Sequence, residues 1–166
     1  RTALKHGPED IFNDLFDTYP TEKNSEIKQD ICGALTSTKE PQLAKQILSN
    51  LKDEDWVKKQ DVDRFIVNLL ANRWTKELAW NWLTSNWAWI EKMFASDKSY
   101  DNYPRYAAST FNNQEWLKRY QQFFGPKKKI VALKRNIVLG ELEIKNRIKW
   151  ASRDQQKLID WLNQDA

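Results

Sequence analysis

Apolar side chains recur every three or four residues along most of the chain, and only short polar breaks interrupt this helical spacing. The spacing is clearest in the segments 11–16, 27–35, 43–51 and 62–70. Short connections between such segments indicate helices that run antiparallel to their neighbours. The 166 residues include only four glycines and five prolines, too few for the many tight turns of a sandwich or barrel. The sequence therefore predicts an all-α fold with eight or nine helices.

The middle of the chain is rich in aromatic residues. Residues 75–94 carry apolar side chains on two sides of one expected helix, which predicts a helix packed between neighbours with its tryptophans in the core. Residues 96–114 are polar and turn-like, so we expect a loop or hinge there. Asn112 and Glu115 have the spacing of a capping box for the helix that follows. The predicted core includes Leu48, Phe65, Leu69, Trp80, Leu83, Trp87, Ile137 and Trp161.

Two further helices are expected at the end of the chain. The first covers roughly residues 127–150, and Ser152 is expected to cap the second. Gly140 lies inside the first, where glycine costs about 1 kcal/mol relative to alanine. Close approach of another helix would explain that glycine. Two ion pairs in the favourable i,i+4 order are expected, Glu141 with Lys145 and Glu143 with Arg147.

The chain lacks the usual motifs of catalysis. It contains no H-E-x-x-H, no glycine-rich phosphate loop and no G-x-S-x-G. Its single histidine, His6, and single cysteine, Cys32, cannot supply the ligand spacing of a zinc site. We interpret the acidic runs 53–55 and 61–63 as charges at helix N-termini, where the macrodipole favours them. We therefore predict no catalytic residue, no metal ligand and no cofactor within this chain.

Basic residues are concentrated in one stretch. Residues 116–149 hold ten basic and two acidic side chains, whereas residues 1–115 hold 15 basic and 18 acidic ones. Such asymmetry is typical of nucleic-acid binding. The tryptophans lie mostly elsewhere, however, and no known binding motif overlaps the stretch. Residues 127–129, three lysines expected in the first turn of a helix, could hold an anion, but a solvated basic face is the favoured interpretation.

Several features bear on location. The longest stretch without a charged residue, 78–90, has 13 residues and includes Asn, Ser and Thr, too short and too polar to span a bilayer. One cysteine and no Asn-x-Ser/Thr sequon favour a reducing compartment, so we expect a cytoplasmic protein without a membrane partner. The first residue is Arg1 and the sole methionine is Met93, so we expect a piece of a longer chain.

An ordered series of short motifs resembles a known family. The motifs are Lys59-Gln60-Asp61, Leu70-Ala71-Asn72, Leu78-Ala79-Trp80-Asn81-Trp82, Asn86-Trp87, Phe123-Phe124-Gly125-Pro126, Ile144, Ile148-Lys149-Trp150 and Leu158-x-x-Trp161-Leu162. In this order they resemble the C-terminal helical domain of the aminopeptidase N family of zinc metallopeptidases. The chain departs from the family at Asn72-Arg73-Trp74-Thr75, where the family usually has Asn-Pro-x-Gly.

The resemblance implies a right-handed superhelix of antiparallel helix pairs, similar to HEAT or armadillo stacks. It also implies that residues 1–166 form a single C-terminal lid domain of a longer aminopeptidase. In that family the helical domain closes over a zinc-containing catalytic domain and shapes a chamber for peptides. The implied partners are therefore the other domains of the parent chain and peptide substrates, and the zinc belongs to the parent's catalytic domain.

A basic chamber wall would attract the free carboxylate of a peptide, and arginine is a natural partner for it. The candidates are Arg73, in the turn that departs from the family, and Arg105 and Arg119, near the expected hinge and the following helix. For any one of these arginines, an exposed charge that only aids solubility is the favoured interpretation. The competing hypothesis is a free-standing helical-repeat adaptor or nucleic-acid-binding module that uses the basic stretch. A zinc-binding H-E-x-x-H upstream in the parent sequence would distinguish the two.

Overall fold

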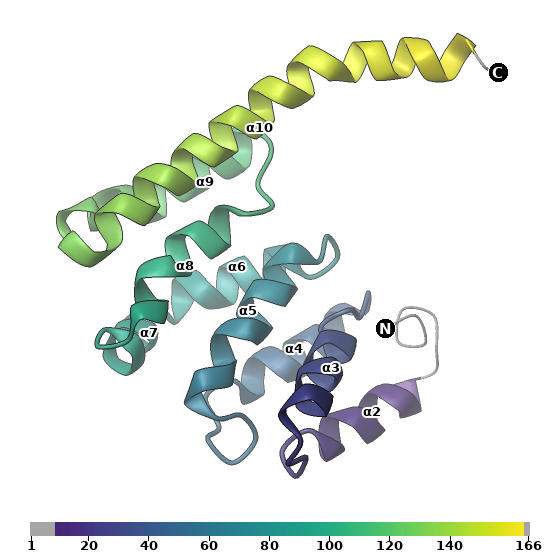
Figure 1. Ribbon diagram of the computed structural model, residues 1–166, viewed down its shortest axis with the longest axis vertical. Helices are drawn as coiled ribbons and strands as arrows, with labels where there is room; N and C mark the ends of the chain where they lie inside the picture. Colours follow the sequence, from purple (N-terminus) through teal and green to yellow (C-terminus); the bar gives the residue numbers. More distant parts are fainter. Residues whose placement is uncertain (1–8, 165–166) are drawn as a thin grey trace. The chain divides into compact units, whose positions relative to one another are not determined.

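The computed structural model describes residues 9–164, which form nine α-helices and two short 3-10 helices (Figure 1). No strand occurs in this described range, and the all-α prediction is confirmed. The chain divides into two compact units, residues 1–94 and 95–166.

Within its described residues, 9–94, the first unit holds six α-helices. They are α2 (Glu9–Thr18), α3 (Ser25–Leu35), α4 (Pro41–Asn50), α5 (Val62–Ala71), α6 (Lys76–Ser85) and α7 (Trp87–Phe94), with the 3-10 helix η1 (Lys59–Asp61) before α5. Pro41 opens α4, where its missing N–H costs nothing. Asn24 caps α3, because its Oδ1 accepts hydrogen bonds from the backbone N–H groups of Glu26 and Ile27. Helix α2 packs on α3, and α6 packs on both α4 and α5.

An aromatic cluster ties α2 to α5. The ring centre of Trp56 lies 4.6 Å from that of Phe16 and 5.1 Å from that of Phe65. Tyr19, just after α2, meets Phe65 edge-on at 5.0 Å. Trp56 also donates from Nε1 to the backbone oxygen of Phe16 at 3.2 Å, so this buried indole has a hydrogen-bond partner.

The helix expected over residues 75–94 is two helices. The break falls at Asn86, whose side-chain Nδ2 donates to the backbone oxygen of Trp82 at 2.7 Å. The core interpretation of the tryptophans is confirmed on one face, because Trp80 and Trp87 are buried. The second face is half-buried, and there the rings of Trp82 and Trp89 meet edge-on at 6.0 Å.

The described part of the second unit, residues 95–164, holds three α-helices. They are α8 (Lys98–Ala108), α9 (Gln114–Phe124) and α10 (Val131–Gln164), with the 3-10 helix η2 (Gly125–Lys129) before α10. The loop expected over residues 96–114 is wrong, because most of it is α8. Buried Tyr100, Tyr103 and Ala107 give α8 an apolar face at helical spacing, and this face packs along α10. The cap of α9 is Asn113, which accepts from the backbone N–H of Trp116 at 2.9 Å, and not Asn112.

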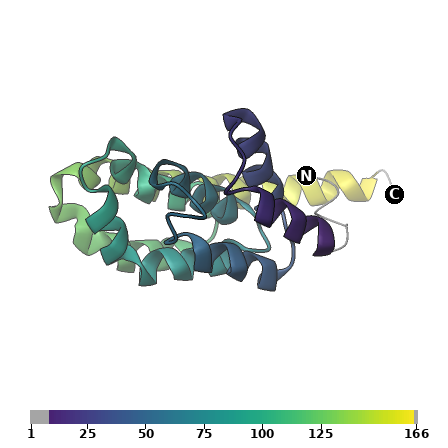
Figure 2. The same cartoon turned by 90° about the horizontal axis from the view of Figure 1, so that it is seen from below.

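Helix α10 corrects the expected pair of C-terminal helices. It runs without a break through Ser152 to Gln164. Trp161 was expected in the core, but 58% of its surface is exposed, and the other seven predicted core residues are buried. Figures 1 and 2 show the reason, since the end of α10 extends past α8 and α9. Residues 127–129 lie in η2, so they are not the first turn of the long helix.

Gly140 allows the close approach predicted for it. A Cβ atom at this position would lie 2.5 Å from the Tyr120 hydroxyl and 3.0 Å from the Ala108 Cβ atom. Helices α8 and α9 therefore both press against α10 at a point where only a hydrogen atom fits.

Candidate functional site

Arg73 lies exposed in the turn between α5 and α6. Its guanidinium carbon lies 4.7 Å from the centre of the Trp74 ring, a cation–π contact. Trp74 is itself half exposed. The turn therefore presents a cation and an aromatic face together to solvent.

The same turn is held without the proline and glycine that the family usually has there. Asn72 donates from Nδ2 to the backbone oxygens of Thr36 and Thr38 at 3.0 and 2.7 Å, and its Oδ1 accepts from the Trp74 N–H at 3.0 Å. Thr75 is fully buried and donates from its hydroxyl to the Leu69 oxygen at 2.8 Å. These bonds fix the turn that carries Arg73.

The other two candidate arginines lie in the second unit and already have neighbours. Arg105, on α8, donates from Nε to Glu143 Oε1 on α10 at 2.9 Å, and 55% of its side chain remains exposed. The guanidinium of Arg119, on α9, lies 4.2 Å from the centre of the Trp116 ring. Because Arg73 belongs to the first unit, a shared role for the three in binding substrate stays a prediction.

Glu141 organises part of the basic stretch. Its carboxylate accepts from Lys128 at 2.8 Å, from Lys145 at 2.7 Å and from the amide of Gln121 at 2.7 Å. The hydrogen bond from Lys128, followed by that from Lys145, lowers the pKa of Glu141 to about 2. The pair with Lys145 confirms one expected i,i+4 contact, whereas the link to η2 was not predicted.

Arg147 has a role that its sequence position does not reveal. Its Nε donates to the backbone oxygen of Phe111 at 2.8 Å, and its Nη2 donates to the backbone oxygen of Ala108. Ala108 is the last residue of α8, and its carbonyl also accepts from the Phe111 N–H at 3.2 Å, so Arg147 adds a charged donor at this helix end. The expected partner of Arg147 was Glu143, which pairs with Arg105 instead.

The described residues do not fit a zinc site. Within residues 9–164, no three side chains of His, Cys, Asp or Glu come together in a way that could hold a metal ion. Cys32 is buried, and the amide of Asn68 lies 3.9 Å from its sulfur. His6 lies outside the described residues. No helix in the same range is both long enough and apolar enough to cross a membrane.

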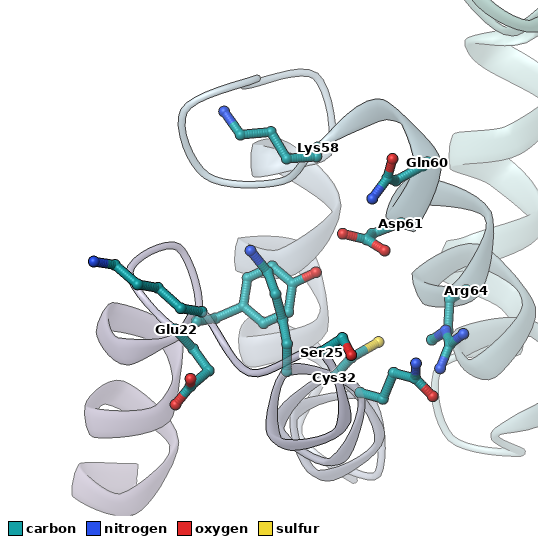
Figure 3. Close-up of a pocket in the computed structure, with 11 residues that line it drawn as sticks. Glu22, Ser25, Cys32, Lys58, Gln60, Asp61 and Arg64 are labelled. Atoms are coloured by element: carbon teal, nitrogen blue, oxygen red, sulfur yellow. The ribbon is translucent and has the colours of Figure 1, made fainter.

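A pocket of about 230 Å³ lies in the first unit (Figure 3). Its walls come from the α2–α3 loop, α3, η1 and the start of α5. The lining residues are Tyr19, Glu22, Lys23, Ser25, Lys28, Gln29, Cys32, Lys58, Gln60, Asp61 and Arg64. Four lysine and arginine side chains and two carboxylates thus surround one cavity. Sequence reasoning missed it, because its residues come from segments far apart in the chain.

Comparisons with known proteins place the chain in a family. The ERAP1-like C-terminal domain matches residues 1–144. The chain is 30% identical over 145 residues to aminopeptidase N of Lactococcus lactis subsp. lactis, a match that covers 87% of this chain and 17% of that protein. It is 27% identical over 154 residues to aminopeptidase N of Lactobacillus helveticus, covering 93% and 18%. It is 29% identical over 157 residues to glutamyl aminopeptidase of Mus musculus, covering 93% and 16%.

The chain therefore spans less than a fifth of the length of these relatives. The family match, in contrast, takes in most of the chain. The motif series that runs from Lys59 to Ile144 lies wholly within the matched residues. On this evidence the chain belongs to the ERAP1-like C-terminal domains of the aminopeptidase N family.

Proposed function

We propose that this chain is the C-terminal helical domain of a zinc-dependent aminopeptidase that removes N-terminal residues from peptides. The observation that carries the proposal is the match of residues 1–144 to the ERAP1-like C-terminal domain, together with aminopeptidase relatives about five to six times as long. The zinc ion and the catalytic residues would lie in another part of the parent chain, since the residues described here do not fit a zinc site.

In this proposal the chain is a single lid domain whose helix pairs continue as a right-handed superhelix. It closes over the catalytic domain and shapes the chamber that peptides enter. A wall of this kind assists hydrolysis by positioning the substrate and by excluding water from the reacting bond. A cytoplasmic location for the parent enzyme stays part of the proposal.

Arg73 is the candidate best placed to meet the free carboxylate of a peptide. It is exposed, and its turn is held in place by the hydrogen bonds of Asn72. The contact with Trp74 places the guanidinium beside a half-exposed aromatic ring. Arg105 and Arg119 are secondary candidates, because a substrate would compete with Glu143 for the guanidinium of Arg105 and because Arg119 is only half exposed.

The test uses the full-length parent enzyme in three forms: wild type, Arg73→Gln, and a truncation that lacks residues 1–166. We expect the truncation to reduce kcat/KM for peptides far more than it changes zinc content. We expect Arg73→Gln to reduce kcat/KM by roughly tenfold for peptides with a free carboxylate, the value of one charge-assisted contact. The same variant should leave hydrolysis of peptide amides unchanged.

Lys45→Gln provides the matched control, because Lys45 is an exposed cation on α4 outside the pocket and the α5–α6 turn. It should behave as wild type with both substrates. If the truncated enzyme folds, keeps its zinc and cleaves long and short peptides with unchanged kcat/KM, the proposed lid role is wrong. If Arg73→Gln affects peptides and their amides equally, Arg73 does not bind the carboxylate.

A further inference from the structure

We propose that the pocket of the first unit binds a small zwitterion of the amino-acid class, with its carboxylate at Arg64 and its ammonium group at Asp61. The inference rests on the pocket itself and does not depend on the proposed peptidase function.

Asp61 and Arg64 carry opposite charges one helical turn apart, at the start of α5. Charged pairs at this i,i+3 spacing normally interact on a helix surface. Here the two side chains make no hydrogen bond or ion pair with each other or with any other residue in the described range. Figure 3 shows both on the η1–α5 side of the pocket with their charged ends apart. Two separated, opposite charges on one wall are complementary to a ligand that carries both signs.

Two buried polar side chains also line the pocket. Tyr19 and Cys32 are each 1% exposed, yet both line the cavity. Burial raises the pKa of the Tyr19 hydroxyl well above its usual range, and the nearby Asp61 carboxylate raises it further. Tyr19 therefore keeps its proton and can act as both donor and acceptor at neutral pH. The ammonium group of Lys28 lies 4.7 Å from the centre of the Tyr19 ring, which adds a cation next to this tyrosine.

Charge and size narrow the ligand class. The lining holds four cations against two carboxylates, so a plain cation is disfavoured and a plain anion such as phosphate is the main competitor. The Asp61 carboxylate would repel that anion but would attract the ammonium group of a zwitterion. The volume of about 230 Å³ is below the roughly 300–1,000 Å³ of pockets for drug-sized ligands. The cavity therefore suits a single amino acid better than a longer peptide.

The experiment measures binding to the full-length protein that contains this chain, by isothermal titration calorimetry at millimolar ligand. The probes are L-leucine, leucinamide without the carboxylate, 4-methylpentanoate without the ammonium group, the dipeptide Leu-Leu, and inorganic phosphate. Each probe is titrated into wild type, Asp61→Asn and Arg64→Gln. Binding that the two variants lose belongs to the pocket, whereas binding that they retain belongs to another site.

We expect part of the L-leucine binding to depend on the pocket and to weaken roughly tenfold or more in each variant, as for loss of one charged hydrogen bond. We call this part the variant-sensitive component. Leucinamide and 4-methylpentanoate should each lack that component. The control variants are Asp17→Asn and Lys45→Gln, which remove exposed charges on α2 and α4 outside the pocket and should bind leucine as wild type does. The thermal midpoint of each variant should match wild type.

Three outcomes would overturn the proposal. The first is leucine binding that neither Asp61→Asn nor Arg64→Gln changes. The second is a variant-sensitive component for phosphate as strong as that for leucine, which would indicate a simple anion site. The third is a stronger variant-sensitive component for Leu-Leu, which would indicate a peptide site. None of these outcomes bears on the lid role, which is measured by peptide turnover.

Discussion

At the scale of single residues, Gly140 gives the most direct test of the close packing in the second unit. Because Gly140 has no Cβ atom, there is room beside it for the Tyr120 hydroxyl. That hydroxyl donates a hydrogen bond to the backbone oxygen of Ile137 at 3.3 Å. We expect Gly140→Ala to destabilise the chain by roughly 1–3 kcal/mol, the usual cost of overpacking. That loss outweighs the gain of about 1 kcal/mol in helix propensity. Urea denaturation measures the free energy of unfolding.

Gly125→Ala is the comparison, because a Cβ atom at Gly125 would meet nothing within 4 Å apart from its own chain neighbours. Gly125 has a helical backbone and precedes Pro126, where a Cβ atom is disfavoured, so alanine should cost something but less than Gly140→Ala does. Equal effects of the two substitutions would show that the contact with Tyr120 does not limit the packing.

Glu141 predicts a pH dependence of stability. Its pKa is lowered to about 2 from an ordinary value of 4.5, so the carboxylate binds protons more weakly in the folded chain than in the unfolded chain. The stabilisation is therefore complete above about pH 4.5 and is lost as the pH falls towards 2. We expect Glu141→Gln to cost about 1–2 kcal/mol at pH 7, as for loss of charged hydrogen bonds. The cost should shrink as the pH falls through that window.

Urea denaturation of wild type and Glu141→Gln at a series of pH values measures this difference. The control is Glu115→Gln, since Glu115 is an exposed residue in the first turn of α9. A difference between wild type and Glu141→Gln that stays constant from neutral pH to pH 2 would contradict the assignment of the effect to the carboxylate charge.

At the scale of helices, the sequence predicted the buried faces better than the helix ends. Apolar spacing identified α2 to α5 and the core side chains Phe65 and Leu69, because burial follows directly from periodicity. It missed α8, where Pro104 and many polar side chains hide an apolar face made largely of tyrosine and alanine. It also missed the break at Asn86, which depends on a side chain bonding to the preceding turn.

In the candidate site too, the sequence predicted some features and missed others. The basic side chains could be selected from charge alone, but their partners depend on tertiary contacts between helices. Arg105 and Glu143 are 38 positions apart, and the lining residues of the pocket come from four separate segments. Spacing along one helix therefore predicted the Glu141–Lys145 pair but could predict neither of those arrangements.

Arg147 is predicted to hold α8 against α10. Removing its guanidinium leaves the carbonyls of Ala108 and Phe111 without their charged donor. We expect Arg147→Gln to cost about 1–3 kcal/mol, the penalty for a partly buried group that loses its hydrogen bond. Hydrogen exchange measured by mass spectrometry should show faster exchange at the C-terminal end of α8 than in wild type.

Arg153→Gln serves as the comparison on the same helix. Arg153 pairs only with its sequence neighbour Asp154 among the described residues, and 66% of its side chain is exposed. An exposed pair of this kind contributes little, so the free energy of unfolding of this variant should match that of wild type. If Arg147→Gln were as mild as Arg153→Gln, the bonds to the α8 end would contribute little to stability.

At the scale of the whole molecule, the uneven charge distribution separates the lid role from nucleic-acid binding. The chain carries a formal net charge of +4, and residues 116–149 alone carry ten basic and two acidic side chains. Part of that excess is engaged inside the fold, because Lys128 and Lys145 both bond to Glu141 and Arg147 bonds to α8. Fewer cations than the sequence suggested are therefore available for phosphate groups.

We therefore expect only weak, non-specific association with DNA or RNA, with an affinity that falls steeply as salt is added, because each neutralised phosphate releases counterions. Fluorescence anisotropy with a labelled single-stranded and a labelled double-stranded oligonucleotide, across a salt series, measures it. Neutralising Lys134 and Arg135, both exposed on α10, should reduce the salt slope by about two phosphate contacts. Neutralising Lys28 and Lys45 of the first unit should leave the salt slope unchanged.

Submicromolar binding at physiological salt that is abolished by neutralising Lys127, Lys128, Lys129, Lys134 and Arg135 would instead establish the basic stretch as a nucleic-acid site. In that case, the charge excess would be functional in itself, and not a solvated face of a domain that acts through its parent enzyme.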